Sequence, residues 1–315
     1  MISVVIPLFN KAPYVDICIK SVLHSAEYID VGFEIIVIDD CSSDNSVNVV
    51  EGFFPSVRLI RLPRNSGPSV ARNLGVKIAS FDMVYFLDAD DFVSPHFFSK
   101  LVDTIVKFPD RKVFTFGICS VSKEQNISLW DKSNNIAESC DKFEYHRGLC
   151  SGKLVFSASS TCLHKSVFES VGYFNESSRY SEDAEFWARV SECYDVVFDK
   201  SWLVAYRSVP DSLSQKTFSN LTSKPILISR LYEQACNYNN CYIVKAAFSV
   251  MFFKYLILAS VGLSKTGKQL IFSFDYFKKC TLYYKFLSII VMLTPSCVMR
   301  IFFRAYIYYR NLRLR

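Results

Sequence analysis

The sequence predicts an α/β protein in which a mostly parallel sheet is flanked by helices. Over the first 120 residues, short runs rich in β-branched residues alternate with segments of helical periodicity. Because strand–helix–strand repeats connect through right-handed crossovers, this alternation favours parallel strands covered by helices. The chain is 50% hydrophobic and 16% aromatic, so it can bury a sizeable core and is not expected to be disordered.

Five apolar runs have the length of buried parallel strands. They are Ile2–Ile6, Glu34–Ile38, Val57–Arg61, Val84–Leu87 and Val113–Phe116. Helices are expected to begin near Pro13, Pro68 and Pro95, where proline suits a first turn and apolar residues follow at helical spacing. A later helix is expected near Ser181. Residues 120–160 are polar and are expected to form an irregular surface excursion, with regular structure returning near Thr161.

Aspartates directly follow two of the predicted strands. Asp39-Asp40 comes after the second, and Asp88-Ala89-Asp90-Asp91 after the fourth. Ligands in such sheets bind beyond the carboxyl ends of the strands, so both clusters should face one crevice. Turn or helix-cap aspartates would explain a single cluster. Two clusters in equivalent places indicate a ligand site, and the spacing of Asp88 and Asp90 suits Mg²⁺ or Mn²⁺.

Five motifs, in order, resemble those of the family 2 glycosyltransferases. They are SVVIPLFNKAPYV at Ser3–Val15, IIVIDDCSSDNS at Ile35–Ser46, NSGPSVARNLG at Asn65–Gly75, VYFLDADD at Val84–Asp91 and VGYFNESSRYSEDAEFWARV at Val171–Val190. The resemblance covers roughly residues 1–215. It implies the Rossmann-like GT-A fold and an inverting, metal-dependent transfer of a sugar from a nucleotide-diphosphate donor.

By the same resemblance, the first four motifs supply the nucleotide and metal site. The expected nucleotide contacts are Pro7, Phe9, Asp39, Asp40, Asn65, Arg72 and Asp88. Asp90 is the implied direct metal ligand, with Asp88 nearer the ribose, and Asp91 is expected to be structural. Alternative interpretations stay open: Arg72 in a surface ion pair, and Asn65 and Asn73 as turn or cap residues.

Asp183 is the expected catalytic base. The acceptor hydroxyl must lose its proton as it attacks the sugar opposite the leaving group. If Ser181 is the N-cap, Asp183 lies in the first helical turn, where the helix dipole favours its ionised form and Glu182 opposes it. Without the resemblance, these acids would be interpreted as surface residues of the first helical turn that have no catalytic role.

Three further side chains are candidates for diphosphate or acceptor contacts, namely Glu182, Trp187 and Arg207. Core packing is an equally good interpretation of Trp187. Many relatives carry a histidine two or three residues after the position of Arg207. This chain has Val209 and Pro210 there, which places a histidine metal ligand in doubt.

The C-terminal part is basic and apolar. From residue 240 onward there are twelve basic residues and one acid, Asp275, in a chain of net charge +6. We therefore expect a catalytic domain over residues 1–220 and a helical tail over 221–315 that lies on an anionic membrane surface. Apolar runs at 241–263 and 286–303 are interrupted, so a spanning helix is not favoured. The alternative is a soluble helical subdomain; nucleic-acid binding is not expected, because the bases are interleaved with aliphatic stretches.

The eleven cysteines include no CxxC pair and are expected to be reduced core residues of a cytosolic protein. The N-terminus lacks the basic and long apolar segments of a signal peptide, so the active domain is expected inside the cell, at the inner face of the membrane.

The sequence thus predicts a hexosyl- or N-acetylhexosaminyltransferase that uses a UDP-sugar and a saccharide or lipid-linked saccharide acceptor, in bacterial surface polysaccharide synthesis. Two other functions remain. A sugar-nucleotide nucleotidyltransferase should have a Gly-rich basic loop after the first strand, where this chain has Pro7-Leu8-Phe9-Asn10. A non-catalytic membrane scaffold that retains the fold would not need Asp88, Asp90 and Asp183.

Overall fold

The computed structural model describes residues 1–121, 137–152, 156–178, 181–209, 225–261, 274–294 and 299. The chain forms two compact units. One comprises Met1–Tyr145 and Leu154–Val209, and the other comprises His146–Lys153 and Pro210–Arg315. The predicted domain boundary at residue 220 lies outside the described residues.

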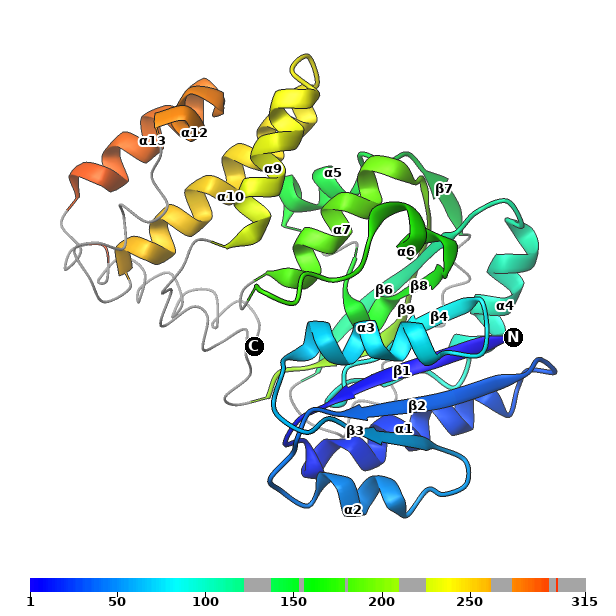
Figure 1. Cartoon of the computed structure of the whole chain (residues 1–315). Coiled ribbons are helices and arrows are strands. Elements are labelled where there is room, and N and C mark those ends of the chain that lie inside the picture. The colour runs from blue at the N-terminus through cyan, green and yellow to red at the C-terminus, as the bar shows by residue number, and fades with distance from the viewer. Residues whose placement is uncertain are drawn as a thin grey trace. The chain divides into compact units, whose positions relative to one another are not determined.

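The first unit is built on one nine-stranded sheet, whose order is β3-β2-β1-β4-β8-β6-β9-β5, with β7 paired to β9. Figure 1 shows this sheet with helices on both faces. The strands are β1 (Ile2–Leu8), β2 (Phe33–Asp39), β3 (Arg58–Arg61), β4 (Met83–Phe86), β5 (Phe92–Val93), β6 (Val113–Val121), β7 (Glu138–Cys140), β8 (Thr161–His164) and β9 (Val196–Arg207). All five predicted strand runs are present within a few residues of their expected bounds.

Helices cover the parallel part of the sheet from both sides. They are α1 (Ala12–Ala26), α2 (Ser46–Glu51), α3 (Pro68–Ile78) and α4 (Phe97–Lys107). The side chains of α1 and α4 share a core with alternate strand residues such as Val4 and Tyr85. The intervening residue Val5 faces α3 instead: a Cβ built on Gly75 would lie 2.2 Å from its Cγ1. Glycine at 75 therefore lets α3 approach the sheet closely.

The sheet is mixed, which corrects the expectation of a mostly parallel one. Strands β3, β2, β1 and β4 are parallel to one another, and β6 is parallel to β9. However, β8 lies antiparallel between β4 and β6, and both β5 and β7 are antiparallel to β9. After β6 the chain passes through a long segment and enters β8 in the direction opposite to that of β4 and β6.

The segment expected to be irregular is partly regular. Its described part contains β7 and the helix α5 (Glu144–Ser151), followed by a short 3₁₀ turn at Ala158–Ser160 before β8. Two more helices, α6 (Ser166–Val171) and α7 (Glu182–Cys193), then lead into β9. The polar stretch at 122–136 lies outside the described residues.

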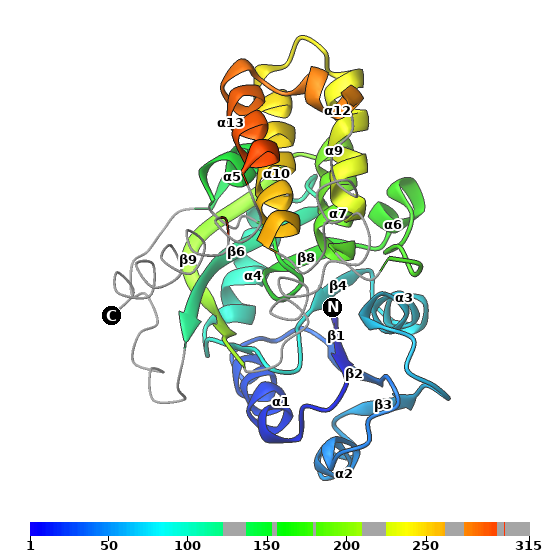
Figure 2. The same ribbon diagram turned by 90° about the vertical axis from the view of Figure 1, so that its left-hand side faces the viewer.

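In its described part, the second unit is helical. Its helices are α9 (Ile226–Asn237), α10 (Tyr242–Val261), α12 (Phe274–Lys279) and α13 (Leu282–Leu293). Figure 2 shows α10 running beside α9 and α13. The rings of Tyr232, Phe248 and Tyr276 pack together among these helices. Within the described residues, no helix combines the length and the apolar character needed to cross a bilayer.

The cysteines only partly follow the expectation of core residues. All ten cysteines in the described part of the chain are free thiols. Cys18, Cys162 and Cys280 are buried, but Cys41, Cys150 and Cys193 are exposed. Burial in an apolar run could be foreseen for Cys18, whereas Cys193 ends its helix at the surface because it follows the last buried turn of α7.

Candidate functional site

Two buried aspartates at the end of β2 organise the loops beside the site. Asp40 accepts hydrogen bonds from the backbone N–H groups of Ser66 and Gly67 at 2.6 and 2.8 Å, which fixes the start of α3. Asp39 accepts from the backbone N–H of Ser42 at 3.2 Å. Both carboxylates thus have protein partners, and their expected contact with a nucleotide base stays a prediction.

The other expected base contacts lie at the same edge of the sheet. Pro7 is half-buried within β1, and the ring of Phe9, just after the strand, is 44% exposed. The exposed Asn65 donates from Nδ2 to the carbonyl oxygen of Asp40 at 3.4 Å. The exposed ring of Phe9 offers an apolar surface beyond the carboxyl ends of the parallel strands, where ligands of such sheets bind.

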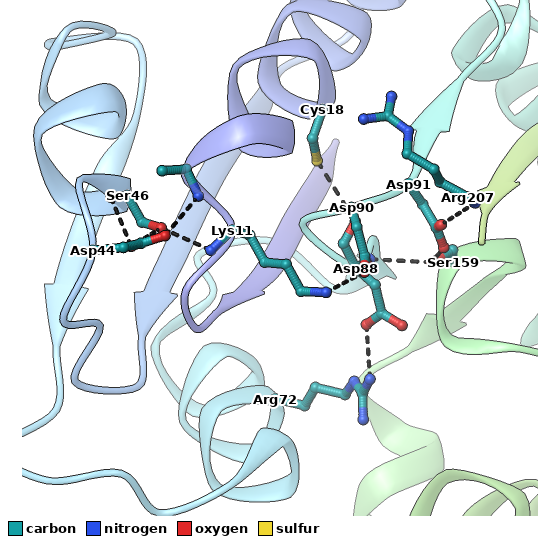
Figure 3. A network of polar contacts seen from close by, with 11 residues as sticks. Lys11, Cys18, Asp44, Ser46, Arg72, Asp88, Asp90, Asp91, Ser159 and Arg207 are labelled. Carbon is teal, nitrogen blue, oxygen red and sulfur yellow. Dashed lines mark hydrogen bonds and ion pairs between the residues drawn. The ribbon is translucent and has the colours of Figure 1, made fainter. Parts of the chain in front are cut away.

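Three aspartates after β4 have three different environments (Figure 3). Asp91 is buried and accepts hydrogen bonds from Ser159 Oγ at 2.6 Å and from the backbone N–H of Arg207 at 2.9 Å. Burial, and then the negative charges of Asp88 and Asp90, raise the pKa of Asp91 well above its usual range. Ser159 Oγ also accepts from the backbone N–H of Asp88 at 3.1 Å, so Asp91 and Ser159 together brace this turn.

Asp88 and Asp90 keep more contact with solvent, and each is paired with a different cation. The Asp88 side chain is 34% exposed and accepts from Arg72 Nη2 at 2.7 Å. The Asp90 side chain is 16% exposed and is in contact with the ammonium group of Lys11. Two carboxylates and two cations therefore face one another at the carboxyl ends of β1 and β4.

Arg72 joins this turn to the start of α7. Arg72 is 5% exposed; its guanidinium lies over the ring of Phe174 at 5.6 Å and brings Nη1 to 3.7 Å from Glu182 Oε1. Burial alone would lower the pKa of Arg72, but the carboxylates of Asp88, Glu182 and Asp183 outweigh it and raise that pKa. The interpretation of Arg72 as a surface ion pair is wrong, because this residue is buried among the acids of the site.

Asp183 lies in the first turn of α7, close enough to Asp88 for their charges to interact. Burial raises the pKa of Asp183 and the charge of Asp88 adds to this effect, while Arg72 and the backbone N–H of Ala184, 2.7 Å from Oδ1, lower it. Ser181 is the N-cap residue, with a left-handed φ of 57° and without a side-chain capping bond. The acids at 88 and 183 therefore converge on Arg72.

Glu182 is expected to make folding stability depend on pH near neutrality. Burial, and then the charge of Asp183, raise the pKa of Glu182 to about 7 despite Arg72. In the unfolded chain the pKa of a glutamate is near 4.3. Because the folded state binds this proton more tightly, protonated Glu182 stabilises the fold fully below pH 4.3, and the stabilisation is lost as the pH rises through 7. The free energy of unfolding of Glu182→Gln, relative to that of the wild type, should therefore rise by roughly 2 kcal/mol between pH 5.5 and pH 8.

Urea unfolding of both proteins at the two pH values measures this change. Glu169→Gln is the control, since Glu169 is exposed on α6 and should keep a constant difference from the wild type. A pH-independent difference for Glu182→Gln would contradict the raised pKa.

Trp187 and Arg207 are both buried. Trp187 is 1% exposed and stacks on Phe156 at 5.7 Å with an interplanar angle of 15°, which favours the core-packing interpretation over a sugar contact. The guanidinium of Arg207 lies 5.1 Å from each of the rings of Tyr14 and Phe92. Its Nε and Nη1 atoms have no hydrogen-bond partner in the described part of the chain. Its contact with a diphosphate stays a prediction.

More than half of the chain matches a known protein family. Residues 3–172 match the family described as Glycosyl transferase family 2. The chain belongs to glycosyl transferase family 2.

Several relatives of this glycosyl transferase family 2 chain are known from bacteria. The minor teichoic acid biosynthesis protein GgaA of Bacillus subtilis (strain 168) is 26% identical over 247 residues, which are 74% of this chain and 53% of that protein. The poly(ribitol-phosphate) beta-N-acetylglucosaminyltransferase TarP of Staphylococcus aureus (strain N315) is 40% identical over 93 residues, 29% of this chain and 28% of that protein. The chain thus spans about half of GgaA and less of TarP.

The fold has close counterparts among solved structures. The crystal structure of S. aureus TarS 1–349 in complex with UDP-GlcNAc superposes with a TM-score of 0.71 at 16% identity, covering 96% of this chain and 91% of that chain. The structure of TarS 1–349 alone gives a TM-score of 0.63 at 15% identity. At such identity the likeness shows the fold, and the GT-A fold expected from the motifs is confirmed.

Lys11 and Ser159 were not foreseen as residues of this family 2 site, and the sequence leaves Asn73 open between a site role and a turn or cap role. Lys11 contacts Asp90, and Ser159 links Asp88 to Asp91. Asn73 is buried and exchanges hydrogen bonds of 2.9 Å with the backbone of Phe174, which ties α3 to the segment before α7. Lys11 and Asn73 lie inside recognised motifs, so their positions offered a signal. Ser159 lies in the segment interpreted as a surface excursion.

Proposed function

We propose that the chain is an inverting glycosyltransferase that moves a hexosyl or N-acetylhexosaminyl group from a UDP-sugar to a saccharide or lipid-linked saccharide. The observation that carries the proposal is the convergence of Asp88, Arg72, Glu182 and Asp183 at one edge of the sheet of a family 2 chain. This arrangement places acids from two distant segments around one buried cation.

The relatives support the substrate class. TarS has been crystallised with UDP-GlcNAc, and TarP is described as a beta-N-acetylglucosaminyltransferase acting on poly(ribitol-phosphate). GgaA is described as a teichoic acid biosynthesis protein. These similarities support the proposal of a UDP-sugar donor and of a role in bacterial surface polysaccharide synthesis.

In this proposal, Asp183 takes the proton from the acceptor hydroxyl while that oxygen attacks the anomeric carbon. Arg72 keeps a positive charge between Asp183 and Asp88, which favours the ionised form of Asp183 against the effect of burial. Because Asp183 acts opposite the leaving group, the configuration at the anomeric carbon inverts in one step.

Asp88 and Asp90 fit a divalent cation, Mn²⁺ or Mg²⁺, by the chemistry of their donors. Asp88 Oδ2 and Asp90 Oδ1 accept no hydrogen bond within the described residues. No group of three or more His, Cys, Asp or Glu side chains in that part of the chain could hold a metal by itself. Mg²⁺ sites built from one or two carboxylates plus substrate phosphates and water meet this pattern. The bound cation would offset the charge that develops on the leaving diphosphate.

The decisive experiment incubates the purified chain with UDP-sugars, Mn²⁺ and saccharide acceptors. Release of UDP together with a glycosylated product supports the proposal. Turnover of pyrophosphate would favour the nucleotidyltransferase alternative, and absence of any turnover would favour a scaffold. Binding of the donor alone, detected as a rise in Tm, identifies the sugar, because a ligand that binds only the folded state stabilises it.

We also propose that the protein works at the cytoplasmic face of the membrane and docks there through α13. Four apolar side chains of this helix recur at helical spacing and are 47 to 85% exposed, namely Leu282, Phe286, Ile289 and Leu293. The helix contains no acid, and Lys278 and Lys279 precede it. An apolar stripe flanked by lysines is typical of helices that lie in the interface of an anionic bilayer.

Vesicle binding is expected to depend on this stripe. The double variant Phe286→Asp/Leu293→Asp should bind vesicles of phosphatidylcholine with phosphatidylglycerol more than about tenfold less tightly, because two large apolar groups lose their burial. Cosedimentation measures it, and Val106→Asp, at an exposed apolar position of α4, is the matched control. Equal binding of both variants would contradict docking through α13, and no binding by the wild type would favour a soluble subdomain.

A further inference from the structure

Lys11 has a fixed backbone at the edge of the site and a positively charged side chain. Its N–H donates to Ser46 Oγ at 2.8 Å, and the N–H of Ala12 donates to Asp44 Oδ2 at 3.0 Å. Burial works against ionisation of Asp44, but hydrogen bonds from the Ser46 hydroxyl and from the backbone N–H groups of Ala12 and Ser46 outweigh it and lower the pKa of Asp44. The start of α1 is thereby tied to the loop after β2, and only the side chain of Lys11 remains free to move.

The two cations beside the aspartates differ in how firmly they are held. Arg72 is buried, lies over Phe174 and faces Glu182 as well as Asp88. The Lys11 side chain is 24% exposed and its ion pair is with Asp90, with the ring of Tyr14 at 6.0 Å from Nζ. Figure 3 shows Lys11 and Arg72 approaching the two aspartates from different directions, Arg72 being paired with Asp88. Of the two cations, Lys11 is therefore the one that can leave its aspartate more easily.

We propose that Lys11 is a resident counter-ion of Asp90 that competes with the divalent cation and, once released, pairs with a phosphate of the nucleotide donor. This inference rests on the proposed function. The ammonium of Lys11 holds Asp90 Oδ2, and its positive charge repels a divalent cation at the same carboxylate, so the ion pair weakens binding of the metal alone. The flexible four-carbon stem lets the ammonium move while its backbone stays fixed.

The exchange predicts two effects of opposite sign. Without nucleotide, removal of the competing ammonium should strengthen Mn²⁺ binding, because the binding-competent state no longer has to be reached by breaking an ion pair. At saturating Mn²⁺, the same change should weaken UDP binding, because a charge-assisted contact with phosphate is lost. A residue with a merely structural role would weaken both.

Titration calorimetry of the full chain tests this with Mn²⁺ alone and then with UDP at saturating Mn²⁺. Lys11→Met should bind Mn²⁺ about threefold to tenfold more tightly and UDP about tenfold less tightly than the wild type. Lys11→Arg, which keeps the cation, should stay near the wild type in both. Lys20→Met is the matched control, because Lys20 makes an exposed ion pair with Asp16 on the same helix.

The outcomes separate the inference from the proposed function. Equal Mn²⁺ affinity of Lys11→Met and the wild type, both folded by circular dichroism, would overturn the role of Lys11 alone. Weaker binding of both ligands would assign the residue to structure and also overturn it. No Mn²⁺ binding by any of the four proteins would overturn the metal assignment, and this inference with it.

Discussion

Replacing Asp183 with asparagine is expected to leave donor binding intact and to slow sugar transfer by about 10²–10⁴-fold, the usual contribution of a general base. Asparagine has nearly the same shape as aspartate but cannot accept the proton of the acceptor hydroxyl. Arg72 is paired with Asp88 at 2.7 Å in the wild type, so this cation should stay in place when Asp183 is replaced. Steady-state rates of UDP release, with UDP affinity measured separately, check both parts.

Asp195→Asn is the matched control for this result. Asp195 follows the same helix and makes an ion pair with Arg111 at 2.8 Å, with both side chains about 40% exposed. Exposed ion pairs of this kind contribute little to stability. The transfer rate and the UDP affinity of Asp195→Asn should therefore equal those of the wild type. A normal transfer rate in Asp183→Asn would refute the assignment of the base. Loss of UDP binding would assign Asp183 to the donor instead.

The parts of the fold that could be predicted are those set by local pattern. The run Val84–Leu87 predicts β4 because buried parallel strands are short and continuously apolar. The direction of β8 could not be predicted, because Thr161–His164 pairs with β4 and β6, and no local pattern records the path of the chain between them. Together with β5 and β7, which are antiparallel to β9, this strand makes the sheet mixed.

The same distinction holds in the site. The rule for strand ends locates Asp88 and Asp90 at the ligand edge, and the family motif adds Asp183. The partners of these acids come from far along the chain: Lys11 is 79 positions from Asp90, and Ser159 is 68 from Asp91. A sequence does not state which distant polar groups will meet. Trp187 shows the complementary case, since packing and sugar stacking require the same residue type and only burial distinguishes them.

Replacing Asp90 with asparagine is expected to abolish the rise in Tm that Mn²⁺ gives the wild type and to lower transfer by about 10²–10³-fold, because stabilisation of the leaving diphosphate is lost. An amide carries no charge to hold the cation, and Lys11 loses its ion pair at the same time. Asp82→Asn is the control: it makes the same substitution at the other end of β4, where the side chain is exposed. If the Tm shift with Mn²⁺ persists in Asp90→Asn and disappears in Asp88→Asn, Asp88 is the metal ligand instead. If the shift disappears in Asp82→Asn, the Tm shift does not report on metal binding at this site.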